Sequence, residues 1–94
     1  MLGLNVTYRM KPGKREEFLA QVTAQGILAA IRAEEGCLGY RYFCSVEDPD
    51  QLLLVERWTD EQAQATHMGQ PHMKQLAAIK EICALDTKLE RYQL

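Results

Sequence analysis

The first third of the chain predicts a strand followed by a helix. Over residues 2–8 apolar side chains alternate with other residues, which is the two-residue period of an extended strand with one apolar face. From residue 14 to about residue 34 apolar positions recur every three or four residues, which predicts a helix that follows the Pro12 turn and ends at Gly36. Gly26 lies inside this helix and indicates either a close contact with the sheet or a local bend.

The middle third predicts a β-hairpin. Residues 37–46 and 51–58 are rich in strand formers and are separated by a turn around Pro49. Residues 52–55 are all apolar, so both faces of the second strand are apolar, which a sheet open to water on one side does not favour. Because a domain of this size has a thin core, the sheet of a second copy is the expected cover, and we predict an obligate homodimer.

The last third predicts two helical segments and a closing strand. Thr59 or Asp60 caps a short helix that stops near Gly69, and a second segment starts at Pro71 and reaches about residue 83. Residues 85–92 alternate again, as a strand does. The order is strand, helix, strand, strand, helix, strand. It predicts a single α+β domain over residues 1–94 with the ferredoxin-like plait, an antiparallel sheet with its helices on one face.

Composition and charge narrow the range of functions. The 94 residues are 47% apolar and 26% charged, as in a soluble globular domain, and no apolar run is long enough to cross a bilayer. Eleven Lys and Arg against thirteen Asp and Glu give a net charge of −2, which offers no attraction to nucleic acid or to an anionic membrane. Three cysteines without C-x-x-C spacing, and a start unlike a signal peptide, favour a cytoplasmic location and no cysteine chemistry.

Two histidines are the leading acid–base candidates. His67 and His72 titrate near neutrality and flank the break at residues 69–71, where a loop can expose them to a cavity. On a continuous helix they would lie about 140° apart, so shared metal ligation would need the break to reorient them, and we expect no metal. The alternative is that His72 lies on the surface, while His67 fills a half-buried slot and hydrogen-bonds to backbone.

The strands carry further candidates. Asn5 is the one amide in the middle of the first strand, and its side chain points to the face opposite Leu4 and Val6. In a pocket it would hold an oxyanion; otherwise it pairs across the strand with another polar group. Glu56 is expected in a cross-strand or cross-dimer ion pair rather than in catalysis. Aromatic residues on adjacent strands either line a slot for a flat ligand or fill the core or dimer interface. These are Tyr8, Tyr40, Tyr42, Phe43 and Trp58.

Four segments together resemble the antibiotic biosynthesis monooxygenase domain, in their order and spacing over nearly the whole chain. They are residues 8–18 (YRMKPGKREEF), 35–40 (EGCLGY), 54–60 (LVERWTD) and 65–72 (ATHMGQPH). The resemblance implies a ferredoxin-like dimeric α/β barrel. It also implies an oxygenase that uses no flavin, haem or metal and oxidises a quinol or a polycyclic phenol or anthrone with O2.

An oxygenase of this kind needs a base, donors for an oxyanion, and a dry pocket, because the substrate is its own cofactor. With the resemblance, the site residues are expected to be His67 or His72 as the base, Asn5 with Tyr40 or Tyr42 as donors, and Trp58, Met68 and Met73 as part of the apolar wall. The expected partners are a small aromatic substrate, O2 and a second copy of the chain.

Other branches of the same family remain as alternatives. Haem-degrading members resemble one another in having a tryptophan and, downstream of it, a histidine that binds iron. This chain has His67 at about the position of the tryptophan and Leu76 or Ala77 at about that of the histidine, so haem cleavage is not expected. Isomerases of phosphorylated signalling sugars resemble the chain around H-x-x-x-P-H and need only proton transfer. A dimer that binds a small ligand without turnover is the third possibility.

Overall fold

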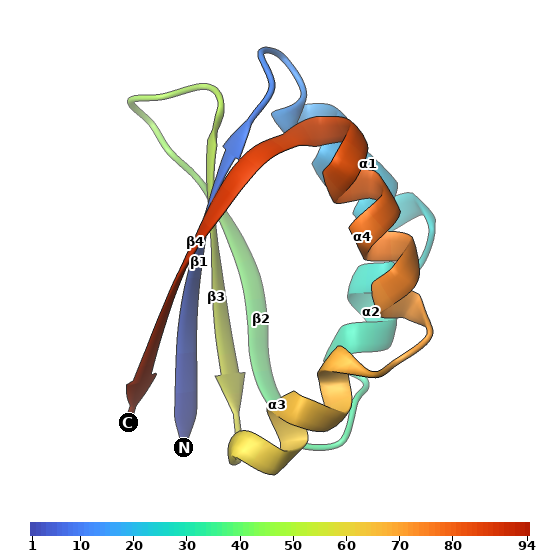
Figure 1. Cartoon of the computed structure of the whole chain (residues 1–94), viewed down its shortest axis with the longest axis vertical. Coiled ribbons are helices and arrows are strands. Elements are labelled where there is room, and N and C mark those ends of the chain that lie inside the picture. The colour runs from blue at the N-terminus through green and yellow to red at the C-terminus, as the bar shows by residue number, and fades with distance from the viewer.

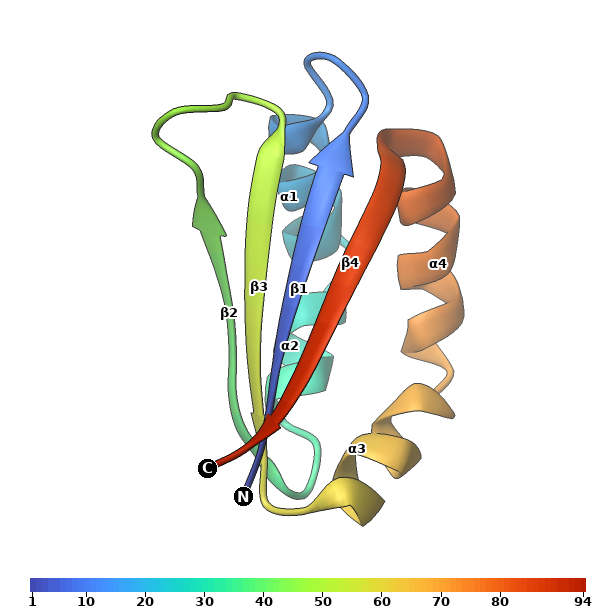
Figure 2. The ribbon, with the colours of Figure 1, turned by 60° about the vertical axis from the view of Figure 1, so that its left-hand side comes forward.

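The computed structural model describes all residues from 1 to 94. It contains four strands and four short helices. In chain order they are β1 (Leu2–Met10), α1 (Arg15–Ala24), α2 (Ile27–Arg32), β2 (Cys37–Cys44), β3 (Gln51–Trp58), α3 (Glu61–Met68), α4 (His72–Cys83) and β4 (Ala84–Gln93). The strands form one antiparallel sheet in the order β2-β3-β1-β4 (Figure 2). This is the predicted ferredoxin-like plait.

All four helices lie on one side of the sheet, which we call the inner face (Figure 1). Alternate residues of β1 and β3 point toward the helices and are buried, as the two-residue period requires. Phe18 and Val22 of α1, Ile27 and Ile31 of α2, and Leu76 of α4 close the core from the other side. Only 19 of the 94 residues are buried, so the core is as thin as the chain length predicts.

The helix predicted from residue 14 to residue 34 is in fact two helices. α1 ends at Ala24 and α2 begins at Ile27, because Gly26 adopts a left-handed conformation with φ of 73°. A Cβ added at Gly26 would meet no atom within 4 Å. Of the two sequence interpretations of Gly26, the bend is therefore correct and the close contact with the sheet is wrong.

The second helical region breaks where the sequence predicts. Asp60 caps α3, and its Oδ1 accepts a hydrogen bond of 2.8 Å from the Ala63 amide. α3 ends at Met68 beside Gly69, and α4 begins at His72 after Pro71. The break redirects the chain between the two histidines, which brings them within reach of one carboxylate.

The opposite side of the sheet, which we call the outer face, is not covered by any helix. Leu53 and Val55 of β3 lie on it half-buried, and Phe43 is 45% exposed. The sheet is open rather than closed into a barrel, so closure of the barrel by a second copy stays a prediction. No helix has the length and apolar character that a membrane span requires.

Candidate functional site

Two histidines share one carboxylate oxygen at the junction of α2, α3 and α4. His67 Nδ1 lies 2.9 Å from Glu34 Oε2, and His72 Nε2 lies 2.7 Å from the same atom. The side chains of His67, Glu34 and His72 are 1%, 8% and 17% exposed, so the cluster extends from the core to the surface. The predicted histidine pair is therefore a real cluster, and Glu34 is the member that joins it.

Local structure explains why these residues meet. Glu34 follows α2, His67 lies in the last turn of α3, and His72 opens α4. The chain can bring α3 against the end of α2 because Gly36 has φ of 86° and no side chain. A Cβ at Gly36 would lie 2.6 Å from the Cβ of Ala63 in α3, closer than two carbon atoms can approach.

The hydrogen bonds fix the tautomers of both imidazoles. An ionised carboxylate only accepts hydrogen bonds, so His67 Nδ1 and His72 Nε2 each donate a proton to Glu34. The lone pair of His67 is therefore on Nε2, which has no hydrogen-bond partner in the chain. Nε2 is therefore accessible rather than fully buried. The arrangement is that of a base oriented by a carboxylate.

The same three groups are also potential metal ligands. Glu34, His67 and His72 offer ligand atoms that all lie within 4.8 Å of one another, and two histidines with one carboxylate are a common ligand set. However, tetrahedral zinc ligands lie about 3.3 Å apart, given metal–ligand bonds of about 2.0 Å. The separations of 2.7 and 2.9 Å are those of hydrogen bonds, so the residues as placed form a hydrogen-bonded cluster rather than a metal cage.

A cavity of about 170 Å³ lies between the inner face of the sheet and helices α3 and α4. Apolar side chains from β1, β4 and the helices make up most of its wall. Glu56 on the sheet, His67 on α3 and Lys80 on α4 also line it. His67 therefore borders a partly open, largely apolar space.

Glu56 is a buried carboxyl group on the floor of this cavity. It is 6% exposed, and its Oε1 accepts a hydrogen bond of 3.0 Å from Nε1 of Trp58. Burial raises the pKa of Glu56, while the Trp58 hydrogen bond and the charges of His67 and Lys80 oppose this rise. The cross-strand ion pair predicted for Glu56 is wrong, because its partner is an indole N–H and no cation of the chain lies within salt-bridge distance; the cross-dimer ion pair stays a prediction.

Several of the predicted substrate-binding residues surround the cavity. Tyr40, Met68 and Met73 line it directly. Burial raises the pKa of Tyr40 well above its ordinary value, so its phenol stays protonated and can donate a hydrogen bond. Trp58 lies one layer deeper: its ring packs on the His67 ring with centroids 4.6 Å apart and helps to fix the imidazole. Tyr42 does not line the cavity; it packs edge-on against Tyr40, and its hydroxyl is buried without a partner.

Asn5 is not brought to this cavity. It pairs with Val55 and Glu90 in the sheet and lies on the outer face, and its Oδ1 accepts a hydrogen bond of 2.9 Å from the Tyr92 hydroxyl. The structure thus matches the cross-strand alternative for Asn5. Its grouping with His67 as one site is wrong in this protomer, because the sheet separates the two side chains.

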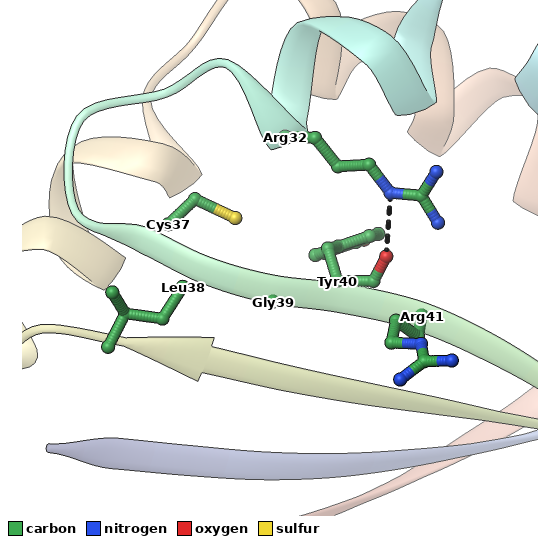
Figure 3. A pocket seen from close by; sticks show the side chains of 6 residues that line it. All are labelled: Arg32, Cys37, Leu38, Gly39, Tyr40 and Arg41. Carbon is green, nitrogen blue, oxygen red and sulfur yellow. Dashed lines mark hydrogen bonds between the residues drawn. The ribbon is translucent and has the colours of Figure 1, made fainter.

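A wider hollow of about 370 Å³ lies at the edge of the sheet beside α2 (Figure 3). Arg32 reaches across it and donates a hydrogen bond of 2.9 Å from Nε to the Tyr40 carbonyl, while Arg41 lies further along β2 (Figure 3). Of the predicted site residues only Tyr40 borders this hollow, and no histidine or carboxylate does. We therefore place the candidate site at the smaller cavity, where ionisable groups converge.

Three residues of the candidate site were not among the site residues predicted from the sequence: Glu34, Glu56 and Lys80. Glu34 sits next to Glu35 in a charged helix end, which is the usual pattern of a solvated surface. Lys80 lies among the polar residues of the α4 pattern, and nothing in its spacing marks it. Glu56 alone had a visible signal, since it follows Leu54 and precedes Trp58 on the apolar face of its strand.

The fold and the site together define a class: small α+β proteins in which a plait holds a compact ligand cavity between its sheet and its helices. Within that class the chain belongs to the antibiotic biosynthesis monooxygenase family, whose family profile matches residues 1–79. This membership confirms the family resemblance; the plait that it implies is the observed fold, and the dimeric barrel stays a prediction.

Individual relatives agree with this assignment. The chain is 34% identical over 95 residues to "Putative monooxygenase YcnE" of Bacillus subtilis (strain 168), covering all of this chain and 98% of that protein. It is also similar to the crystal structure of PA3566 from Pseudomonas aeruginosa, with a TM-score of 0.85, 28% identity and coverage of 99% and 93% of the two chains. The structure titled "Putative antibiotic biosynthesis monooxygenase from Nitrosomonas europaea", at 19% identity, 100% and 98% coverage and a TM-score of 0.89, supports the fold alone.

Proposed function

We propose that this chain is a monooxygenase that oxidises a small quinol with O2 and uses His67 as its general base. The observation that carries the proposal is the geometry of His67. Its Nδ1 is held by Glu34 at 2.9 Å, its Nε2 has no hydrogen-bond partner in the chain, and the residue lines a cavity large enough for an aromatic ring. Family membership and the monooxygenase name of the Bacillus subtilis relative support the reaction class.

The residues fit the first steps of cofactor-independent oxygenation. His67 Nε2 takes the proton of a substrate hydroxyl, and the electron pair of the O–H bond stays on the substrate oxygen. Glu34 stabilises the resulting imidazolium, and His72 holds Glu34 in place through its own hydrogen bond. The anion passes one electron to O2, and the radical pair combines at a ring carbon to a peroxide anion, which takes the proton back from His67 and becomes a hydroperoxide. The C–H bond at that carbon and the O–O bond then break, so that one oxygen leaves as water, the other stays as a carbonyl, and a hydroxylated quinone remains.

The cavity volume favours a small substrate. Pockets for drug-sized ligands measure about 300–1,000 Å³, whereas this cavity measures about 170 Å³. One or two fused rings match that space better than a polycyclic anthrone. Apart from a protonated His67, Lys80 is the only cationic side chain that lines the cavity. A single lysine offers little positive charge to bind the phosphate group of a phosphorylated sugar. The isomerase alternative therefore has less support than a quinol monooxygenase.

A homodimer is part of the proposal. The outer face combines half-buried apolar residues of β3 with Phe43, Tyr92 and Arg57, and the Nε of Arg57 is buried without a partner. A second copy packed on this face would cover its apolar atoms, and the thin core would gain the buried area that a domain of this size lacks.

Oxygen consumption tests the proposed reaction. Wild-type protein with a menadiol-like quinol is expected to consume O2 in an oxygen electrode, and His67→Ala is expected to lower kcat about a hundredfold or more. His72→Ala should have a smaller effect, because His72 acts on the base only through Glu34. Unchanged kcat in His67→Ala would refute the base assignment. Anaerobic conversion of a phosphorylated ketose would favour the isomerase, and saturable quinol binding without product would favour a binding protein.

A further inference from the structure

Lys80 places a cation in the roof of the cavity. It lies on the side of α4 that faces the sheet, it is half-buried, and it lines the same space as His67 and Glu56. Its ammonium group lies 5.4 Å from the centre of the Tyr8 ring, within the range of a cation–π contact. Lysine side chains usually extend into water, so a lysine directed over a buried ring requires a physical reason.

No group in the chain neutralises Lys80 directly. It forms no salt bridge and no side-chain hydrogen bond, although lysines 11 and 14 do form such contacts. The other ionisable groups that line its cavity are Tyr8 from β1, Tyr40 from β2, Glu56 from β3 and His67 from α3; the β4 residues there are uncharged. Burial lowers the pKa of Lys80, and the negative charge of Glu56 opposes this effect. The cavity thus contains an ammonium group whose hydrogen-bond donors are free.

We propose that Lys80 is the oxyanion-binding residue of the site and that the ligand bound there is a phenol held as its phenolate. This inference rests on the proposed function, since it assigns the cation that the base reaction requires. When a phenolic O–H bond breaks and its proton moves to His67 Nε2, the negative charge left on oxygen needs a nearby donor. The Lys80 ammonium supplies a charge-assisted hydrogen bond to that oxygen, and the phenolate becomes a better electron donor to O2 without leaving the apolar cavity.

Three of the ionisable side chains in the cavity then have separate roles. His67 removes the proton, Lys80 holds the resulting anion, and Glu56 keeps the ammonium group charged. Glu56 is a poor candidate for holding the anion, because a carboxylate repels a phenolate. The role also replaces Asn5, which lies on the other face of the sheet.

Binding of a chromophoric phenol tests the inference without any turnover. 4-Nitrophenol reports its own ionisation by absorbance, and 4-nitroanisole is its methyl ether, which cannot ionise. Wild-type protein is expected to lower the pKa of bound 4-nitrophenol by about one to two units, because a hydrogen bond to a charged donor contributes about 1.5–3 kcal/mol. Lys80→Met should weaken phenolate binding about tenfold to a hundredfold and leave 4-nitroanisole binding unchanged. Lys74→Met, on an exposed position of the same helix, is the matched control.

Each outcome decides the inference. Equal phenolate binding by wild type and Lys80→Met overturns it, and so does a wild-type protein that binds neither probe. If Lys80→Met loses both probes, Lys80→Arg distinguishes charge from shape: restored phenolate preference supports the inference, and its absence overturns it. If wild type prefers the phenolate but consumes no O2 with any quinol, the oxyanion role stands and the proposed monooxygenase function fails.

Discussion

The substitution Glu34→Gln separates the electrostatic role of Glu34 from its structural role. Glutamine keeps the length of the side chain and an oxygen that can accept from both imidazoles, but it removes the negative charge. A hydrogen bond to a charged group contributes about 1.5–3 kcal/mol and one between neutral groups about 0.5–1.5 kcal/mol, a difference of about 1–1.5 kcal/mol per bond. Glu34 accepts two such bonds, so the variant should lose about 2–3 kcal/mol of unfolding free energy. A small domain typically has 5–15 kcal/mol, so it should remain folded.

Activity should fall further than this loss of stability suggests. His67 becomes an imidazolium as it takes the substrate proton, and without the Glu34 charge the buried cation is stabilised only by a neutral amide. We expect kcat for O2 uptake to drop about a hundredfold or more while the protein stays folded. Urea unfolding gives the stability, and the oxygen electrode gives kcat on the same preparation. Glu35→Gln, an identical change at the exposed neighbouring residue, should alter neither.

One result would contradict this role of Glu34. A Glu34→Gln protein whose kcat stays within about threefold of wild type, while His67→Ala is inactive, would mean that the carboxylate does not stabilise the imidazolium. Glu34 would then be a purely structural partner of the two histidines.

Three further predictions concern stability and assembly. Burial raises the pKa of Glu56, so just above the ordinary carboxyl pKa the folded protein holds a proton that the unfolded chain has lost. Urea unfolding from pH 4 to 8 should therefore show that wild type loses stability relative to Glu56→Gln as the pH rises. The opposite trend would contradict the raised pKa. Val55→Glu on the outer face should shift sedimentation from dimer to monomer, whereas Val46→Glu in the exposed hairpin loop should not. Gly26→Ala should lower the free energy of unfolding by about 1–2 kcal/mol, because alanine is strained in the left-handed backbone conformation. Gly36→Ala should lower it further, because its Cβ also meets Ala63 of α3. Equal melting temperatures of the two variants would refute this close contact.

The strands and their order along the chain could be predicted because the sequence signal of each strand is local. Alternation over residues 2–8 fixes which side chains of β1 share a face, and the hairpin follows from the turn around Pro49. The split of the first helix could not be decided in the same way. A glycine inside an apolar three-to-four pattern is compatible with a straight helix or with a bend, and only the left-handed φ of Gly26 separates the two.

The site was predictable only in part, because it depends on contacts far apart in the chain. The histidine pair stood out by residue type and by the break between its members. Glu34 lies 33 positions before His67, and nothing local distinguishes it from its solvated neighbour Glu35. Asn5 was placed with the histidines because its own strand shows only that it opposes Leu4 and Val6. The register that pairs Asn5 with Val55 shows that the opposite face is the outer one.

The charges inside this small core bear on whether the cavity is functional. A buried carboxylate, a half-buried ammonium group and a buried imidazole each cost desolvation free energy, and apolar side chains of similar size usually pack at least as stably. A chain with 19 buried residues has little stability to spare for such groups. If the inner face served only to hold the plait together, Glu56 and Lys80 would gain by pairing with each other, yet they form no salt bridge. The absence of this pairing, at a cavity large enough for an aromatic ring, supports the proposed phenol site over a purely structural role.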